Sequence, residues 1–163
     1  SNLGGGSVWP LETLNSIKEF ALKSNLIIHM DGARLMNAVV ASGVSARDFG
    51  SCTDTAWIDL SKGLGCPIGG VLTGAREFID EAWFWKQRLG GGMRQSGMMA
   101  AAGLFALKNN ISRLAEDHEN AKIFAERLSK IDGIELRPNP IETNIIFFTV
   151  NKCEKADKIK TVD

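Results

Sequence analysis

Hydrophobic positions follow two different patterns along the first half of the chain. Between residues 11 and 23 they follow helical spacing, and Pro10 suits the first turn of such a helix because its φ is already fixed. Residues 26–30 and 56–60 are short, nearly continuous apolar runs, which is typical of strands buried on both faces of a parallel sheet. Residues 34–42 predict a short helix ended by Gly43, and residues 69–72 predict a third strand. The pattern favours an α/β fold with a mostly parallel sheet.

The second half is predicted to be mainly helical before its pattern changes. Helices are expected over residues 75–89 and 95–108, and a longer amphipathic one around 114–128; the first carries several aromatic residues and is expected to be well buried. Near Gly133 strands replace helices, at residues 134–136 and 145–150. We therefore predict that residues 1–130 form part of a large domain and residues 131–163 begin a smaller α+β C-terminal domain.

Charge and composition exclude several classes of function. The 163 residues include 19 basic and 19 acidic ones, so neither nucleic acid nor a membrane surface is an expected partner. No apolar run approaches the roughly 20 residues of a membrane span. The three cysteines form no CxxC pair and the two histidines are scattered, so no metal site is expected. The thiols are interpreted as reduced, which favours a cytoplasmic protein.

One lysine has surroundings suited to covalent chemistry. Lys62 follows the second apolar run and enters a glycine-rich turn, so its amine is expected to be accessible and partly desolvated. Asp31 stands at the end of the first apolar run. Pyridoxal phosphate (PLP) needs such a pair, because a lysine binds its aldehyde and a carboxylate keeps its pyridine nitrogen protonated. The alternatives are a surface lysine in a turn and an aspartate that caps a helix.

Three further residues could hold the anionic parts of this cofactor. The Ser61 hydroxyl could donate to a phosphate from the same turn. Arg34 could bind the phenolic oxygen of the cofactor or pair with Asp31. Arg94 follows three glycines at 90–92, which would allow close approach of the backbone to a ligand, although a flexible loop between helices explains them too.

The two histidines are given structural roles. His29 shares the side of the strand that carries Asp31 and is expected to be a packed or hydrogen-bonded core residue. His118 lies among acidic neighbours and is expected on a solvated helix face.

Three blocks of sequence, in register with one another, resemble a known family. Residues 29–34 (HMDGAR), 60–69 (LSKGLGCPIG) and 89–97 (LGGGMRQSG) look like signature blocks of the low-specificity L-threonine aldolases. These are PLP enzymes of fold type I, the aspartate-aminotransferase-like fold, and the resemblance runs from about Gly6 to Val150. It implies that Lys62 attaches the cofactor and Asp31 pairs with its ring nitrogen.

The same resemblance extends to the remaining site residues. It implies that Arg34 lies beside the cofactor and that Ser61 and Arg94 lie on its phosphate side, Arg94 in one interpretation reaching across a dimer interface. It also includes Asn144 in a recurring segment without an assigned role.

The resemblance carries a functional expectation. It implies a PLP-dependent aldehyde-lyase whose substrates are small β-hydroxy-α-amino acids, and which cleaves L-threonine or L-allo-threonine to glycine and acetaldehyde. It also implies a homodimer or homotetramer in the full-length form. The family's upstream phosphate loop, its stacking histidine and its downstream carboxylate-binding arginine have no counterpart here, so we expect the central part of a longer enzyme. Another fold type I activity, β-eliminating lyase or aminotransferase, and a catalytically incomplete fragment stay open as alternatives.

Overall fold

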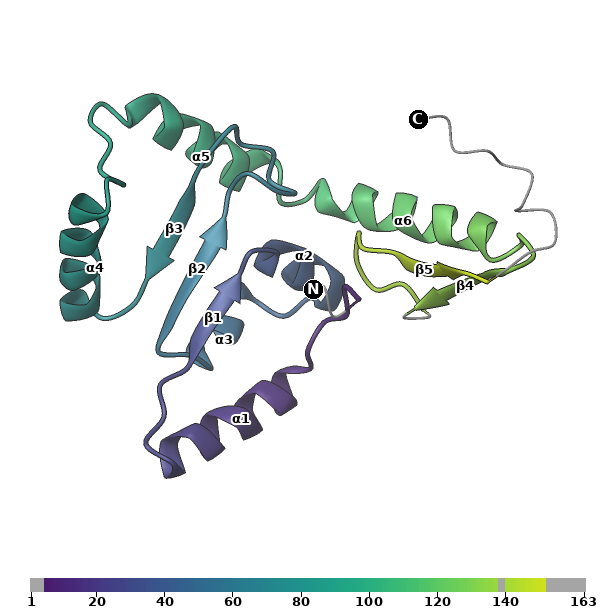
Figure 1. Ribbon diagram of the computed structural model, residues 1–163, viewed down its shortest axis with the longest axis horizontal. Helices are drawn as coiled ribbons and strands as arrows, with labels where there is room; N and C mark the ends of the chain where they lie inside the picture. The colour runs from purple at the N-terminus through teal and green to yellow at the C-terminus, as the bar shows by residue number, and fades with distance from the viewer. Residues whose placement is uncertain (1–4, 138–139, 152–163) are drawn as a thin grey trace.

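A computed structural model of the chain describes residues 5–137 and 140–151, which form two sheets and six helices within those ranges (Figure 1). In chain order the elements are α1 (Leu11–Lys23), β1 (His29–Gly32), α2 (Leu35–Ser42), α3 (Ala46–Ser51), β2 (Thr55–Asp59), β3 (Gly70–Thr73), α4 (Arg76–Arg88), α5 (Gly97–Asn109), α6 (Leu114–Leu128), β4 (Ile134–Arg137) and β5 (Phe147–Val150).

The larger sheet has the strand order β1-β2-β3. Strands β1 and β2 run parallel, with Asp31 in register with Trp57. Strand β3 runs antiparallel to β2 because residues 60–69 are too few for the crossover of a dozen or more that a parallel connection needs. Since β1 and β2 are parallel, their carboxyl ends lie at the same edge of the sheet, and the segments carrying Asp31 and Lys62 both leave from there.

The first strand begins later than the apolar run at residues 26–30 predicts. Leu26 and Ile27 are 56% and 82% exposed, and the ladder with β2 starts only at His29. Asn25 has a positive φ of 52°, and the Leu26 N–H still donates to the Ala21 carbonyl, so Asn25 and Leu26 complete the turn after α1. The prediction of a strand buried on both faces was therefore wrong for this part of the run.

The short helix α2 follows the predicted boundaries closely. It ends at Ser42, and Gly43 takes the left-handed conformation with φ 73° that a helix C-terminus favours. Helix α3, which the sequence did not predict, begins after Ser45, whose hydroxyl accepts from the Asp48 N–H. Helix α3 contacts both α1 and α2.

The main hydrophobic core lies directly beneath the turn that contains Lys62. Its buried members come from this turn and from α5 and the start of α6: Leu60, Leu64, Cys66, Ala106 and Leu114. Met36 and Val40 of α2 pack against them. The turn is thus anchored on both sides of the lysine by buried leucines.

A second cluster joins α6 to the β4–β5 pair. It consists of Ala121, Ala125 and Ile141, with Leu136 and Ile146 packed against them. Figure 1 shows this hairpin and α6 set apart from the three-stranded sheet. Helix α6 contacts both α2 and β4, and the domain boundary near residue 130 stays a prediction.

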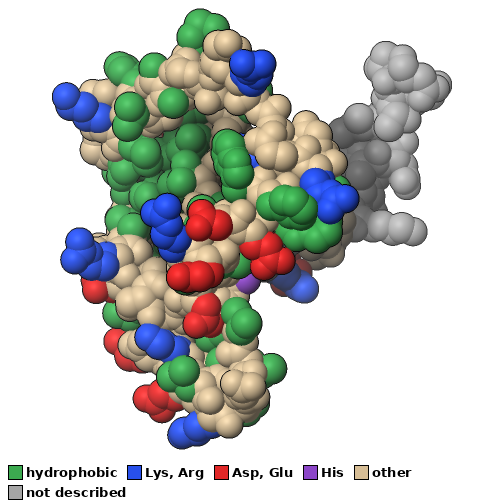
Figure 2. Space-filling view, turned by 90° about the vertical axis from the view of Figure 1, so that its left-hand side faces the viewer, with side chains coloured by type: hydrophobic (Ala, Val, Ile, Leu, Met, Phe, Trp, Pro, Cys, Tyr) green, Lys and Arg blue, Asp and Glu red, His purple; other side chains and the backbone are tan. Residues whose placement is uncertain are grey.

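Helices α4 and α5 expose much of their apolar surface. No residue of α4 is buried, so the expectation of a well-buried helix over residues 75–89 was wrong. Helical spacing predicts which side of a helix is apolar, but not whether another element covers that side. Hydrophobic side chains gather over the upper half of the face occupied by α4, β3 and α5 (Figure 2).

We expect this 163-residue chain, prepared alone, to self-associate through α4 and α5, because a large exposed apolar surface favours association. Replacing Leu104 and Phe105, 71% and 63% exposed, by serine should shift sedimentation-velocity profiles towards monomer. Ile27→Ser, which removes an 82% exposed side chain elsewhere, is the control. Monomeric wild-type chain at tens of micromolar would contradict the expectation.

Other expectations from composition concern thiols, metals and membranes. Cys52 and Cys66 are buried free thiols, and Cys153 lies outside the described residues. Across residues 5–137 and 140–151, no group of three or more metal-ligating side chains comes together. Within the same ranges, no helix is both long enough and apolar enough to cross a bilayer.

Candidate active site

Lys62 is presented by a short, hydrogen-bonded turn. The Gly65 N–H donates to the Lys62 carbonyl at 2.8 Å, and the Cys66 N–H donates to the Leu60 carbonyl at 2.9 Å. Gly65 has a positive φ of 74°, which favours glycine at this position. The Lys62 side chain is 37% exposed, so an ordered backbone holds an amine that solvent and ligands can reach.

Asp59, at the end of β2, is the main partner of this amine. Its Oδ2 lies 2.7 Å from Lys62 Nζ, while its Oδ1 accepts from both the N–H and the hydroxyl of Ser61, each at 2.7 Å. Burial by itself raises the pKa of this carboxyl, but the hydrogen bonds from Lys62 and Ser61 outweigh burial and lower the pKa to about 2. Asp59 therefore carries a full negative charge next to Lys62 at neutral pH.

Asp59 was not among the predicted site residues. An Asp-x-Ser sequence ahead of a glycine-rich stretch is typical of a turn in which the carboxylate accepts from the backbone two residues later. That signal was present, but it predicts a turn and not an ion pair with Lys62.

Trp57 brings Asp31 and Lys62 to the same face of the sheet. Residues in register on neighbouring strands point to the same face, and Asp31 is the register partner of Trp57. Lys62 Nζ in turn lies 5.4 Å from the centroid of the Trp57 ring, within the range of a cation–π contact. The amine and the carboxylate that the sequence paired therefore lie on one face, at neighbouring strand ends.

Asp31 also stabilises the loop that precedes α2. Its Oδ1 accepts from the Ala33 N–H at 3.1 Å. The N-cap residue of α2 is Arg34, and no side chain caps that helix end. Asp31 is thus not the helix cap of the alternative interpretation, although it does hold the loop in place.

Arg34 lies between Asp31 and the turn that contains Lys62. With Asp31, His29 and Trp9 it lines a cavity of about 480 Å³. With Asp59 and Gly63 it lines a much smaller crevice between the start of α2 and the Lys62 turn. Arg34 thus lies near both acidic residues, and its place next to a ligand stays a prediction.

His29 is hydrogen-bonded but is not a core residue. Its side chain is exposed, and Nδ1 lies 2.8 Å from the Thr55 hydroxyl across the β1–β2 ladder. The residue lies at the start of β1, an edge strand of the sheet. The prediction was correct for the hydrogen bond and wrong for the burial.

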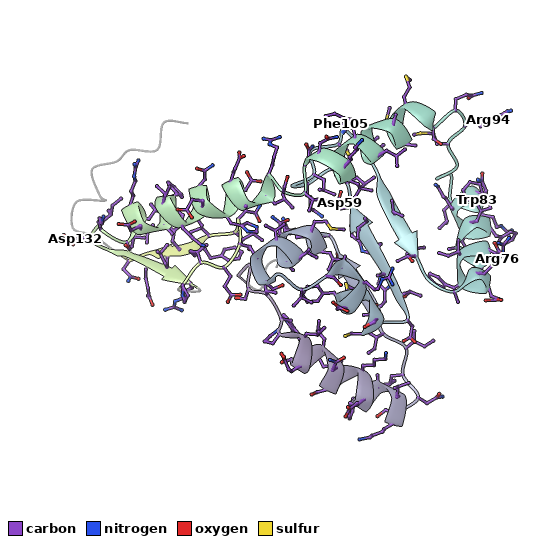
Figure 3. The ribbon with its side chains drawn as sticks, turned by 180° about the vertical axis from the view of Figure 1, so that it is seen from behind. Asp59, Arg76, Trp83, Arg94, Phe105 and Asp132 are labelled. Atoms are coloured by element: carbon purple, nitrogen blue, oxygen red, sulfur yellow. The ribbon has the colours of Figure 1, made fainter. Side chains whose placement is uncertain are left out.

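Ser61 and Arg94 have different positions relative to the lysine. Ser61 adjoins Lys62, with its hydroxyl engaged by Asp59. Arg94 lies on the loop between α4 and α5 at the outer edge of the molecule, whereas Asp59 lies near its middle (Figure 3). The chain by itself does not bring Arg94 to Lys62.

His118 was predicted on a solvated face and is instead buried, with 5% of its surface exposed. Its Nε2 lies 3.1 Å from Nδ2 of Asn37, which is also buried. Acidic neighbours in the sequence suggested solvent, but the histidine points inward from α6 towards α2. Burial lowers its pKa, an effect that outweighs the opposing influence of Asp117.

The Asp59 ion pair has a measurable consequence for stability. Folding lowers the pKa of Asp59 from 3.8 to about 2. The stability that this carboxylate contributes is therefore present above pH 3.8 and is lost as pH falls towards 2. Asp59→Asn should therefore lower the free energy of unfolding by about 1 kcal/mol near pH 6, since the exposed lysine is screened by solvent. Urea denaturation at pH 6, 4 and 3 should show this difference shrinking with acid.

Asp80→Asn is the matched control for that measurement. Asp80 forms an exposed ion pair with Arg76 at 3.7 Å, which should contribute little. A difference for Asp59→Asn that stays constant from pH 6 to pH 3 would contradict the assigned pKa.

Residues 1–152 match the model of a family described as beta-eliminating lyase. The low specificity L-threonine aldolase of Escherichia coli K12 is 46% identical over 155 residues, which cover 95% of this chain and 46% of that protein. The low-specificity L-threonine aldolase of Candida albicans is 38% identical over 158 residues, covering 97% of this chain and 41% of the relative. The chain spans less than half the length of these relatives.

Solved structures share the fold. A Listeria monocytogenes structure assigned as an L-allo-threonine aldolase is 28% identical with a TM-score of 0.82, over 88% of this chain and 40% of that one. The Leishmania major threonine aldolase, at 20% identity, supports the fold alone, with a TM-score of 0.73 over 88% of this chain and 43% of its own. The predicted fold class is confirmed. With the family model matching nearly its whole described length, the chain belongs to the beta-eliminating lyase family.

Proposed function

We propose that this chain supplies the cofactor lysine and the ring-facing carboxylate of a PLP-dependent aldehyde-lyase. The proposed reaction cleaves L-threonine or L-allo-threonine to glycine and acetaldehyde. The observation that carries the proposal is the placement of Asp31 and Lys62 on one face of the sheet: Asp31 is in register with Trp57, and the Lys62 amine contacts the Trp57 ring. The names of the relatives, threonine aldolases at up to 46% identity, supply the reaction and the substrate class.

The residues present fit such a cofactor. Lys62 offers an amine that is 37% exposed, and Asp31 offers an exposed carboxylate at the neighbouring strand end. Arg34 adds a cation beside the cavity that Asp31 lines. When bound, PLP would supply an electron sink for the electron pair released as the Cα–Cβ bond of the substrate breaks.

Each residue would have a separate task in this reaction. Lys62 would attach the cofactor and yield its place to the amine of the substrate. Asp31 would keep the pyridine nitrogen protonated, which increases the capacity of the ring to accept electrons. Ser61 and Arg34 would orient the anionic groups, and Arg94 would reach the phosphate only from a second copy of the chain. The β-hydroxyl proton leaves with a base, and glycine and acetaldehyde together contain all atoms of threonine.

The test uses the natural full-length protein with PLP. Borohydride reduction followed by peptide mass spectrometry should find the cofactor on Lys62. Incubation with L-threonine and L-allo-threonine should release glycine and acetaldehyde in equal amounts. An adduct on Lys18, Lys23 or Lys86 would overturn the assignment of the lysine.

A second candidate function is β-elimination, which the description of the matching family model favours. The same lysine and carboxylate would serve it, since elimination also needs a carbanion stabilised by the cofactor ring. Serine would then give pyruvate and ammonia in place of glycine and an aldehyde. Quantifying these products from one enzyme sample separates the two activities.

We further propose a cytoplasmic homodimer or homotetramer that contributes to glycine formation in amino-acid metabolism. The exposed apolar surfaces of α4 and α5, and the distance of Arg94 from the lysine within one chain, support an assembly. Light scattering of the full-length protein measures its oligomeric state directly.

A further inference from the structure

Three polar side chains from distant parts of the sequence meet in the interior next to the Lys62 turn. Asn37 on α2 is 2% exposed and His118 on α6 is 5% exposed. Asn37 Nδ2 lies 3.1 Å from His118 Nε2 and donates to Asn144 Oδ1 at 3.3 Å. Both hydrogens of this amide are therefore used, one towards each partner.

The arrangement requires one form of the histidine. The Asn37 NH₂ group donates to Asn144, and its other hydrogen points at His118 Nε2, so that nitrogen must accept. Only neutral imidazole, with its proton on Nδ1, has an acceptor there. Protonated His118 would present a second donor to the Asn37 amide, and the contact would become repulsive.

The adjacent segment is also tightly held. Thr143 is fully buried, and its hydroxyl donates to the Gly6 carbonyl at 2.6 Å. Asn144 is thus fixed by its neighbour as well as by Asn37, and the polar cluster connects α2, α6 and the segment before β5.

The same amide packs against the residue that follows Lys62. A Cβ added to Gly63 would lie 3.3 Å from Asn37 Oδ1 and 2.8 Å from a methyl group of Leu114. Glycine is therefore required there for the turn to approach α2 and α6 this closely. Asn37 and Gly63 also line one narrow crevice with Asp59, the partner of Lys62.

We infer that Asn37 is a positioning residue for Lys62: held by neutral His118 and by Asn144, its amide seats Gly63, and protonation of His118 loosens the Lys62 turn. The use made of Lys62 rests on the proposed function, whereas the seating of the turn does not. Lys62 would be held for reaction at pH values above the range in which His118 is protonated. At lower pH it would lose its fixed orientation.

The surroundings of His118 make it the group that titrates. On its own helix the charged neighbours that act on it are Asp117 and Lys122. Helix α2 contains no titratable residue, and on the segment before β5 the carboxylate of Glu142 is engaged by the Val8 N–H. Burial lowers the pKa of His118 below 6.5, so the neutral form is favoured in the folded protein, and its contribution to stability is lost as pH falls below that value.

Hydrogen exchange of the full-length protein without cofactor tests the inference. The Gly65 and Cys66 amides donate within the Lys62 turn, and their protection factors, corrected for intrinsic rates, report its order. Between pH 8 and pH 5 we expect their protection to fall about tenfold, the size of one net hydrogen bond. Amides of α1, remote from the cluster, should change much less.

Two variants and a control decide the outcome. His118→Gln retains an acceptor near the Nε2 position and does not titrate, so protection in the turn should stay high at both pH values. Asn37→Ala should reduce the protection of the turn at both pH values. His29→Gln removes the other histidine of the chain and should leave the pH-dependent loss unchanged.

The inference is overturned if His118→Gln keeps the pH-dependent loss, or if α1 loses protection to the same extent as the turn. Should Asn37→Ala not fold, the His118→Gln profile decides alone. Because the measurement needs neither PLP nor substrate, failure of the proposed function would leave its result unaffected.

Discussion

Lys62→Ala in the full-length protein is expected to abolish covalent retention of PLP and to reduce threonine cleavage by about 10⁴-fold or more, the scale seen when a covalent nucleophile is removed. The reason is that Lys62 carries the amine that lies over Trp57, on the sheet face that Asp31 shares. The visible absorbance of the bound cofactor, before and after borohydride, measures retention, and a coupled aldehyde assay measures turnover.

Lys23→Ala is the control for this prediction. Lys23 is exposed in the last turn of α1, so its loss should affect neither measurement. Lys62→Ala should also release Asp59 from its ion pair, which would raise the pKa of that carboxyl from about 2 back towards 3.8. Borohydride-stable cofactor in Lys62→Ala would show that another lysine holds it.

Asp31→Asn is expected to keep part of the cofactor and to lose most of its turnover, on the order of 10²-fold or more, as when a charge is removed from a site of developing transition-state charge. The asparagine can still accept from the Ala33 N–H, so the loop before α2 should keep its structure. The variant therefore separates the electrostatic task of Asp31 from its structural one.

Steady-state kinetics and a cofactor titration check the Asp31 prediction. Asp54→Asn is a suitable control, because Asp54 also accepts from a loop N–H, that of Ile28, but lies at the opposite end of the strands. A kcat close to that of the wild type in Asp31→Asn would assign Asp31 a purely structural role.

Much of the local structure could be predicted from the sequence. The boundaries of α2, β2 and α6 depend on apolar spacing, on Gly43 and on short buried runs, which act within a few residues. The beginning of β1 could not be predicted, because Leu26 and Ile27 are as apolar as a strand core, yet both are exposed and the Leu26 N–H donates back to α1. The exposure of α4 could not be predicted from the sequence either, since coverage of a helix depends on elements far away in the chain.

The sequence by itself determined which residues carry reactive groups: an amine in a glycine-rich turn at Lys62 and a carboxylate at the end of a strand at Asp31. Only the tertiary structure decided what surrounds them. The parallel register places Asp31 beside Trp57, the turn brings Asp59 onto Lys62, and the meeting of α2 with α6 buries His118 against Asn37. The contact of His118 with Asn37 joins residues 81 positions apart, and no local pattern records it, because it arises from how helices pack. Asp59 and Lys62 are only three positions apart, but the local turn signal does not specify their ion pair.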